Sequence, residues 1–412
     1  MLQAGQNILK KHPLLGVGPG NLSRVYNLYR PLQTGSGLDL VQQLHNTPAQ
    51  ILAELGLLGC SGYLLWIFAL LKISLALDRK ITDRTDRILL YSIGASWFAY
   101  SVSSLTDYQL ENIGVSSTLT ITSALLIHLS AQYLSVPPVA VLTKRVRRLT
   151  SLCLLLYLSI TVQFWSRADA GLFMATIAQQ DSQNFDLVAA DTKWTKASQL
   201  IPWDPTYAAL SADQLISTLQ TATDPDSFES LTTAAITSLK SALKAAPNDS
   251  YFNQNLAVLL LPTDPTQAEQ YMRHAVRLFP RSRHYAYYTL GCTYLNQGRA
   301  DKAATSFAIE AISNPQFLVS PLWQQSPFSA LLPSVVTKSL TAWQSLLDAV
   351  PPDSTQHAWL TQQIELTQWW QGKLTAEAQE TNKTLIKALF QIDKDPDLAL
   401  TLLSQATEST PN

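Results

Sequence analysis

Four apolar stretches between residues 57 and 165 constrain the fold of this chain more than any other feature. They are Leu57–Leu77, Ile88–Leu105, Ile113–Leu134 and Leu149–Trp165. Each approaches the length that an α-helix needs to cross a bilayer, although the second is rich in serine and the fourth is short. Only 14% of the 412 residues are charged, against about a quarter in soluble domains. The sequence therefore predicts four transmembrane helices.

The basic residues between these stretches predict the topology. The segments 78–87 and 144–148 each contain four Lys or Arg residues, whereas 106–112 contains two acidic residues and no basic one. Short loops rich in Lys and Arg stay in the cytoplasm. We therefore expect a multi-pass membrane protein in which residues 1–56 and everything after 165 are extracytoplasmic.

Several function classes are disfavoured by the composition. A net charge of −1 argues against a nucleic-acid partner, which requires a basic face. No Asp/His cluster has the spacing of metal ligands. Gly16–Gly20 follows no strand and is not a dinucleotide motif, so we expect no cofactor and interpret this segment as a flexible connection. Cys60 and Cys153 lie in apolar runs, which indicates packing as small hydrophobic residues.

A helix start precedes the first apolar stretch. We expect Thr47 to be the N-cap, Pro48 the first helical residue, and Gln50 the partner that completes a capping box. His45 then lies just outside the helix, where the positive end of the dipole disfavours the imidazolium form. A neutral imidazole at a membrane surface can act as a general base. The alternative is a histidine that only caps an interfacial loop.

After Arg167 one spacing recurs: a small residue, a bulky residue four positions later, usually Ala three later, and Pro five after that. The copies are Ala190/Trp194/Ala197/Pro202, Ala235/Leu239/Ala242/Pro247, Ala268/Met272/Ala275/Pro280 and Ala303/Phe307/Glu310/Pro315. Glu310 breaks the pattern. The last copy also has a matching first helix, with Tyr287, Leu290, Gly291, Tyr294 and Gly298.

These copies resemble the tetratricopeptide repeat (TPR), in which small residues let two helices pack closely. Arrays of such repeats commonly bind a protein partner on one face. A spacer or dimerisation arm without a ligand is the alternative. Trp343, Trp359, Trp369 and Trp370 fall at helical spacing, which predicts core positions rather than carbohydrate platforms.

The first 75 residues contain a series of short motifs in a fixed order. They are His12-Pro13-Leu14-Leu15-Gly16-Val17-Gly18-Pro19-Gly20-Asn21, then Tyr26, Tyr29 and Arg30, then His45-Asn46 and Ala53-Glu54-Leu55-Gly56-Leu57-Leu58-Gly59 before a span. This order resembles the O-antigen ligase/polymerase (Wzy-C) family over about residues 1–75. The number of spans extends the resemblance to about residue 134.

The resemblance implies a GT-C-type glycosyltransferase of the bacterial inner membrane. Such an enzyme transfers a polysaccharide from a polyprenyl-diphosphate carrier to a hydroxyl of a glycan, lipid or protein acceptor at the outer face. His45 matches the essential loop histidine, which would deprotonate the acceptor or engage the diphosphate. Arg30, with Arg24 as second choice, would bind the diphosphate. Asn46 would orient His45 or contact sugar.

Relatives have further spans before this loop, which form the carrier cavity, and an arginine upstream of the position of Met1. We therefore expect the chain to be inactive alone, as a truncated, split or decayed gene product. A second interpretation is a non-catalytic, membrane-anchored TPR scaffold for envelope polysaccharide assembly. A third is an inorganic-carbon transporter-like relative, although the spans contain few ionisable residues beyond Lys72 and His128.

The expected fold is all-α. Residues 1–56 would form an extracytoplasmic loop with interfacial helices, residues 57–165 four transmembrane helices, and residues 166–412 an extracytoplasmic TPR-like α-solenoid.

Overall fold

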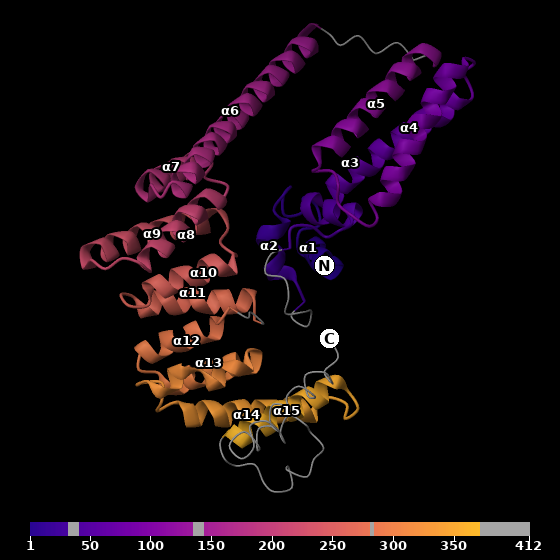
Figure 1. The fold of residues 1–412 in the computed structure, drawn as a ribbon. Coiled ribbons are helices and arrows are strands. Elements are labelled where there is room, and N and C mark those ends of the chain that lie inside the picture. The colour runs from indigo at the N-terminus through magenta and orange to yellow at the C-terminus, as the bar shows by residue number, and fades with distance from the viewer. Residues whose placement is uncertain (32–40, 135–143, 281–283, 371–412) are drawn as a thin grey trace. The chain divides into compact units, whose positions relative to one another are not determined.

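A computed structural model describes residues 1–31, 41–134, 144–280 and 284–370 (Figure 1). Every regular element within these ranges is a helix, which confirms the predicted all-α fold. The chain divides into two compact units. One consists of Met1–Leu260 and Arg273–Arg281, and the other of Leu261–Met272 and Ser282–Asn412. The three-part division expected from the sequence stays a prediction.

The first unit begins with five helices that contain the apolar stretches and the loop before them. They are α1 (Leu2–Lys11), α2 (Leu22–Tyr29), α3 (Thr47–Asp78), α4 (Arg84–Ser103) and α5 (Ile113–Tyr133). It continues with α6 (Lys144–Gln183), α7 (Leu187–Leu200), α8 (Thr206–Leu219), α9 (Pro225–Ala245) and α10 (Ser250–Leu260). Helix α11 (Pro265–Leu278) has residues in both units.

Three of the described helices, α3, α5 and α6, are long and apolar enough to cross a membrane. Helix α4, the second of the four expected spans, does not reach that standard on composition, so its assignment as a span stays a prediction. Its serines lower its hydropathy, and the hydroxyls of Ser96 and Ser101 donate to the carbonyls of Ser92 and Trp97 within the helix.

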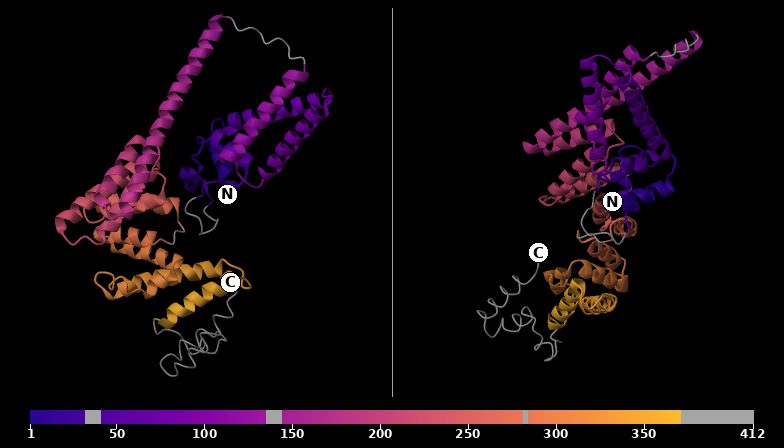
Figure 2. Two further views of the ribbon diagram at one scale, coloured as in Figure 1. Left: turned by 45° about the horizontal axis from the view of Figure 1, so that its top comes forward. Right: turned by 90° about the vertical axis from the view of Figure 1, so that its right-hand side faces the viewer.

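Helices α3, α4 and α5 lie side by side (Figures 1 and 2). Their shared core consists of Leu70, Leu77, Ile81, Leu90, Ile93, Leu126 and Leu129. Trp66 of α3 and Trp97 of α4 meet edge to face, with ring centroids 4.8 Å apart. The Asp83 carboxylate caps α4 by accepting from the N–H groups of Thr85 and Asp86. Packing against two apolar neighbours thus compensates for the polarity of α4.

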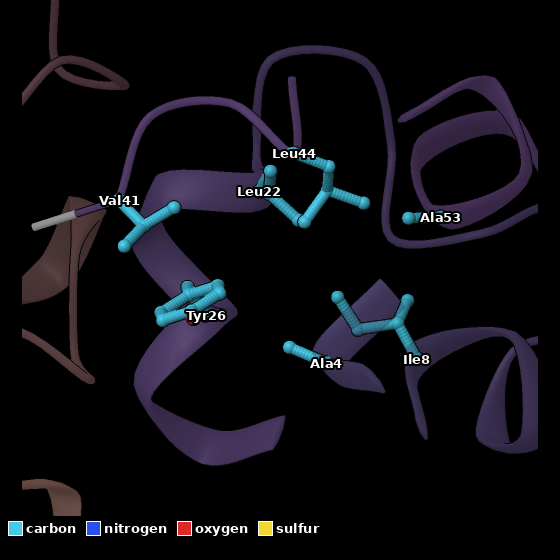
Figure 3. Packing of buried hydrophobic residues seen from close by; sticks show 7 residues of the cluster. All are labelled: Ala4, Ile8, Leu22, Tyr26, Val41, Leu44 and Ala53. Carbon is cyan, nitrogen blue, oxygen red and sulfur yellow. The ribbon is translucent and has the colours of Figure 1, made fainter. Parts of the chain in front are cut away.

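A small second core holds the N-terminal segment together (Figure 3). Side chains of α1, α2, the segment before α3 and the first turns of α3 point toward one another there. These residues are Ala4, Ile8, Leu22, Tyr26, Val41, Leu44 and Ala53. The segment that contains the family-like motifs is therefore a packed substructure.

The glycine-rich segment is fixed by hydrogen bonds to a kink in α3. The N–H groups of Val17 and Gly18 donate to the carbonyls of Ala53 and Glu54 at 3.1 and 2.8 Å. Those of Leu57 and Leu58 donate to the carbonyls of Pro13 and Leu14. Gly16 and Gly56 both have positive φ, at 63° and 64°. The expectation of a flexible connection was wrong, because the two glycine motifs interlock and bring their backbones into close contact.

Helix α6 runs for 40 residues without a break, and its C-terminal half forms the first helical pair of the repeat region with α7. The core of this pair consists of Ala175, Ala178, Ala190, Trp194 and Ala197. The indole of Trp194 stacks on Tyr207 of α8, with centroids 6.4 Å apart. The last apolar stretch and the first helical pair of the repeat region therefore share one continuous helix.

The recurring small and bulky positions are buried wherever they occur. In the first unit they lie on α7 and α9, for example Leu239 and Ala242. Met272 and Ala275 of α11 are buried as well. In the second unit Ala303 and Phe307 lie on α13. The spacing therefore correctly identified the packed faces of these helices.

The second unit contains a further series of short helices. They are α12 (Ala286–Asn296), α13 (Ala300–Ser313), the 3₁₀ turns Pro315–Val319 and Pro321–Gln324, α14 (Leu332–Asp348) and α15 (Thr355–Trp370). Trp343 is fully buried, as predicted, whereas Trp359 is 43% exposed and is not a core residue. The side chains of Trp369 and Trp370 lie outside the described part of the structure.

Glu310 breaks the repeat pattern because it caps a neighbouring helix. Its Oε2 accepts hydrogen bonds from the N–H groups of Tyr287 and Tyr288, at 3.0 and 3.1 Å, at the start of α12. The N-cap of that helix, Tyr285, is left-handed and makes no side-chain capping bond. Glu310 is completely buried, and this burial raises the pKa of its carboxyl group. A carboxylate from α13 thus supplies the missing acceptor.

Candidate functional site

Residues 45–47 are joined to the loop between α4 and α5 by a set of hydrogen bonds. The backbone N–H of Thr47 donates to the Ser104 carbonyl at 2.8 Å. The Thr47 hydroxyl donates to the Asp107 carbonyl at 2.8 Å, and the Asn46 amide donates to the Leu105 carbonyl at 2.8 Å. Two segments about 60 residues apart in sequence therefore form one surface.

The start of α3 differs by one residue from the expected cap. Asn46, not Thr47, is the N-cap, and its Oδ1 accepts from the Ala49 N–H at 2.9 Å. Gln50 does not close a capping box: its Oε1 accepts from the Leu44 N–H, and its Nε2 donates to Glu54. Thr47 does not cap the helix, because its hydroxyl donates a hydrogen bond to the Asp107 carbonyl instead. Asn46 therefore shapes the helix entry, while a sugar contact or an orienting role stays a prediction.

His45 pairs with an acidic side chain from this second loop. Its Nδ1 lies 3.2 Å from Oδ1 of Asp107, and the two side chains are 60% and 44% exposed. The Tyr108 N–H donates to the same Asp107 oxygen at 2.8 Å. That backbone bond, followed by the contact with His45, lowers the pKa of Asp107. An ionised carboxylate at Nδ1 fixes the ring orientation and leaves Nε2 as the second nitrogen for chemistry.

The backbone of His45 is also unusual. Its φ of 50° lies in the left-handed region, which costs a non-glycine residue of order 1 kcal/mol or more. The bonds of Asn46 and Thr47 to residues 104–107 hold this conformation. Sequence reasoning considered only the helix N-terminus next to His45 and did not identify Asp107 as its partner.

The two predicted diphosphate ligands have other neighbours. The guanidinium of Arg24, on α2, donates to the Trp203 carbonyl at 2.7 Å. The guanidinium carbon of Arg30 lies 4.1 Å from the centroid of the Phe279 ring. The structure thus brings His45 and Asn46 together with Asp107. It places Arg24 at the backbone of Trp203 and Arg30 over the ring of Phe279.

Asp107 is the residue that sequence reasoning missed. The loop 106–112 contributed to the topology prediction only through its lack of basic residues, and no local sequence signal links it to His45. The described residues contain no group of three His, Cys, Asp or Glu side chains that could hold a metal ion. All three cysteines are free thiols, and Cys153 is exposed on the apolar part of α6.

These features define an all-α protein with TPR-like helical pairs and helices of membrane-spanning type. Comparison with protein families supports the repeat assignment for one helical pair. The tetratricopeptide repeat family matches residues 284–308, which span the whole of α12 and the first part of α13. The crystal structure of MamA protein is similar over 52% of this chain and 96% of that chain, at 14% identity and a TM-score of 0.33. No curated protein matches the chain.

Proposed function

We propose that the chain carries the acceptor-activating loop and the following spans of an O-antigen ligase-like glycosyltransferase. The pairing of His45 with Asp107 is the observation that supports this function. The Asp107 carboxylate orients the exposed ring of His45. The three hydrogen bonds that Asn46 and Thr47 make to residues 104–107 hold the adjoining backbone in place. Such a histidine is suited to proton transfer at Nε2. The order of motifs noted in the sequence adds the substrate class, a polyprenyl-diphosphate-linked glycan.

The packing of α4 supports the four-span topology that goes with this function. Helix α4 has 20 residues, about 30 Å at 1.5 Å per residue, and it shares its core with α3 and α5. The turn between α3 and α4 is short, so the two helices are antiparallel. If α3 and α5 cross the bilayer, α4 crosses with them despite its serines. Both basic segments then face the cytoplasm, and the His45 surface and the repeat arm are extracytoplasmic.

The test is His45→Ala in a strain whose surface polysaccharide depends on this protein. We expect loss of linkage of the polysaccharide to its acceptor, with normal amounts of protein in the membrane. His12→Ala is the matched control, because His12 is an exposed histidine of the same N-terminal substructure that hydrogen-bonds Tyr29. Linkage that persists at the wild-type level in His45→Ala would exclude the catalytic proposal.

A second candidate is a membrane-anchored TPR scaffold without catalysis. The tetratricopeptide match at residues 284–308 favours it, since such repeats commonly bind protein partners. Deletion of residues 168–412 tests this function. A scaffold loses its partner and its effect on polysaccharide assembly, while His45→Ala leaves both intact.

A further inference from the structure

We propose that the loop between α7 and α8, residues 201–205, lies in the headgroup region of the bilayer, with Trp203 as its anchor. This inference rests on the proposed crossing of the membrane by α6. It adds a direct contact between the repeat arm and phospholipid.

The outer membrane boundary can be located on α6 itself. Its apolar segment Leu149–Trp165 follows the four basic residues of 144–148 and is about 25 Å long at 1.5 Å per residue. A hydrocarbon layer is about 30 Å thick. No part of the apolar window of α6 is buried inside the protein. A segment this short places its last residues, Phe164 and Trp165, at the membrane–water boundary.

Trp203 lies at the same level because it stacks on Phe164. The two rings have centroids 4.7 Å apart and planes 19° apart. On the side away from the apolar segment, the guanidinium of Arg167 lies 5.9 Å from the centroid of Trp203. We call Phe164, Trp165, Arg167 and Trp203 the boundary cluster. Tryptophan favours this depth in membranes, and arginine binds lipid phosphates there.

The boundary cluster is open to its surroundings. Phe164 is 44% and Trp165 59% exposed. Their exposed faces continue into the exposed apolar side chains one and two turns earlier on α6, Ile160 and Tyr157 on the side of Phe164 and Leu158 on the side of Trp165. A surface continuous with the lipid-facing side of a span is covered by lipid, and this continuity favours a phospholipid occupant over a protein partner.

The test uses the full chain in phosphatidylcholine vesicles, with Cys60, Cys153 and Cys292 replaced by Ala. A fluorescent NBD label is attached to a cysteine introduced by Pro202→Cys, at an exposed position beside Trp203. Two matched labels use Tyr157→Cys in the apolar segment and Glu229→Cys, exposed on α9 of the same unit. Quenching is measured with nitroxides on the lipid headgroup or on the acyl chain.

We expect headgroup nitroxides to quench the label at 202 at least about twofold more than the label at 229, and chain nitroxides to quench the label at 157. Trp203→Ser should cut quenching at 202 by about half. If 202 behaves like 229 while 157 is quenched, the loop is in water and the inference is wrong, although the topology stands. If 157 is unquenched, α6 does not cross and both proposals fail.

A second measurement avoids the cysteine replacements. Headgroup nitroxides should quench the intrinsic tryptophan fluorescence of the wild-type chain more than that of Trp203→Phe. Equal fractional quenching in the two proteins, with matching circular dichroism spectra, would contradict the inference.

Discussion

A Cβ atom on Gly56 would lie 2.4 Å from the carbonyl carbon and oxygen of Leu14. A Cβ atom on Gly16 would likewise lie 2.3 Å from the carbonyl carbon of Glu54. The kink of α3 and the Pro13–Gly18 segment therefore fit together only because Gly16 and Gly56 have no side chains.

Gly56→Ala should destabilise the N-terminal substructure by about 2 kcal/mol or more, because φ is positive there and backbone atoms cannot move away from the new methyl group. Thermal unfolding of the detergent-solubilised chain measures the effect. Gly62→Ala is the matched control, since a Cβ at Gly62 meets nothing within 4 Å and alanine favours helix. Similar melting temperatures for both variants would show that the interlock does not matter for stability.

Under the proposed glycosyltransferase function, Asp107→Asn should lower glycan transfer about tenfold or more, with normal protein levels, because His45 loses the carboxylate that orients its ring. The pKa of Asp107 is lowered by the Tyr108 N–H and by His45, so its carboxylate stays ionised and the pair persists as the pH falls to 3.8, the ordinary value. Glu111→Gln, in the same loop but paired with Gln43, serves as control. Transfer that falls equally in both variants would point to loop damage.

The stability of the second unit should depend on pH through Glu310. Burial raises the pKa of Glu310 above its ordinary 4.5, so the folded state binds the proton more tightly than the unfolded state does. Stability is therefore greatest below pH 4.5 and falls as the pH rises through the folded pKa. Glu310→Gln keeps an acceptor without a charge, and its melting temperature relative to wild type should increase from pH 4 to 7. A constant difference over this range would contradict the prediction.

Gly291→Ala should loosen the pair formed by α12 and α13. A Cβ there would lie 2.3 Å from Cε1 of Phe307, which is a core ring of the second unit. Overpacking of this kind costs about 1–3 kcal/mol. Phe307→Leu in the same chain opens space and should recover part of the loss. Differential scanning calorimetry of the single and double variants provides the measurement, and additive losses would mean that the two positions do not interact.

The sequence predicted the helical fold, the repeat faces and the general position of His45, because these depend on local periodicity and short motifs. Buried Leu239 and Met272 follow directly from the recurring spacing. Asp107 could not be found this way, since its pairing with His45 depends on how α4 and α5 return the chain to the start of α3. The capping of α12 by Glu310 was hidden for the same reason. Helix α4 was assigned as a span from length and apolarity, whereas its place depends on packing against α3 and α5.

The uninterrupted course of α6 has a mechanical consequence. Each residue inserted into an α-helix turns everything beyond it by about 100° and advances it by 1.5 Å. One alanine added within Leu149–Trp165 would therefore rotate α7 around the axis of α6 with no hinge to absorb the change. The number of residues in this span therefore fixes the orientation of α7 around the axis of α6.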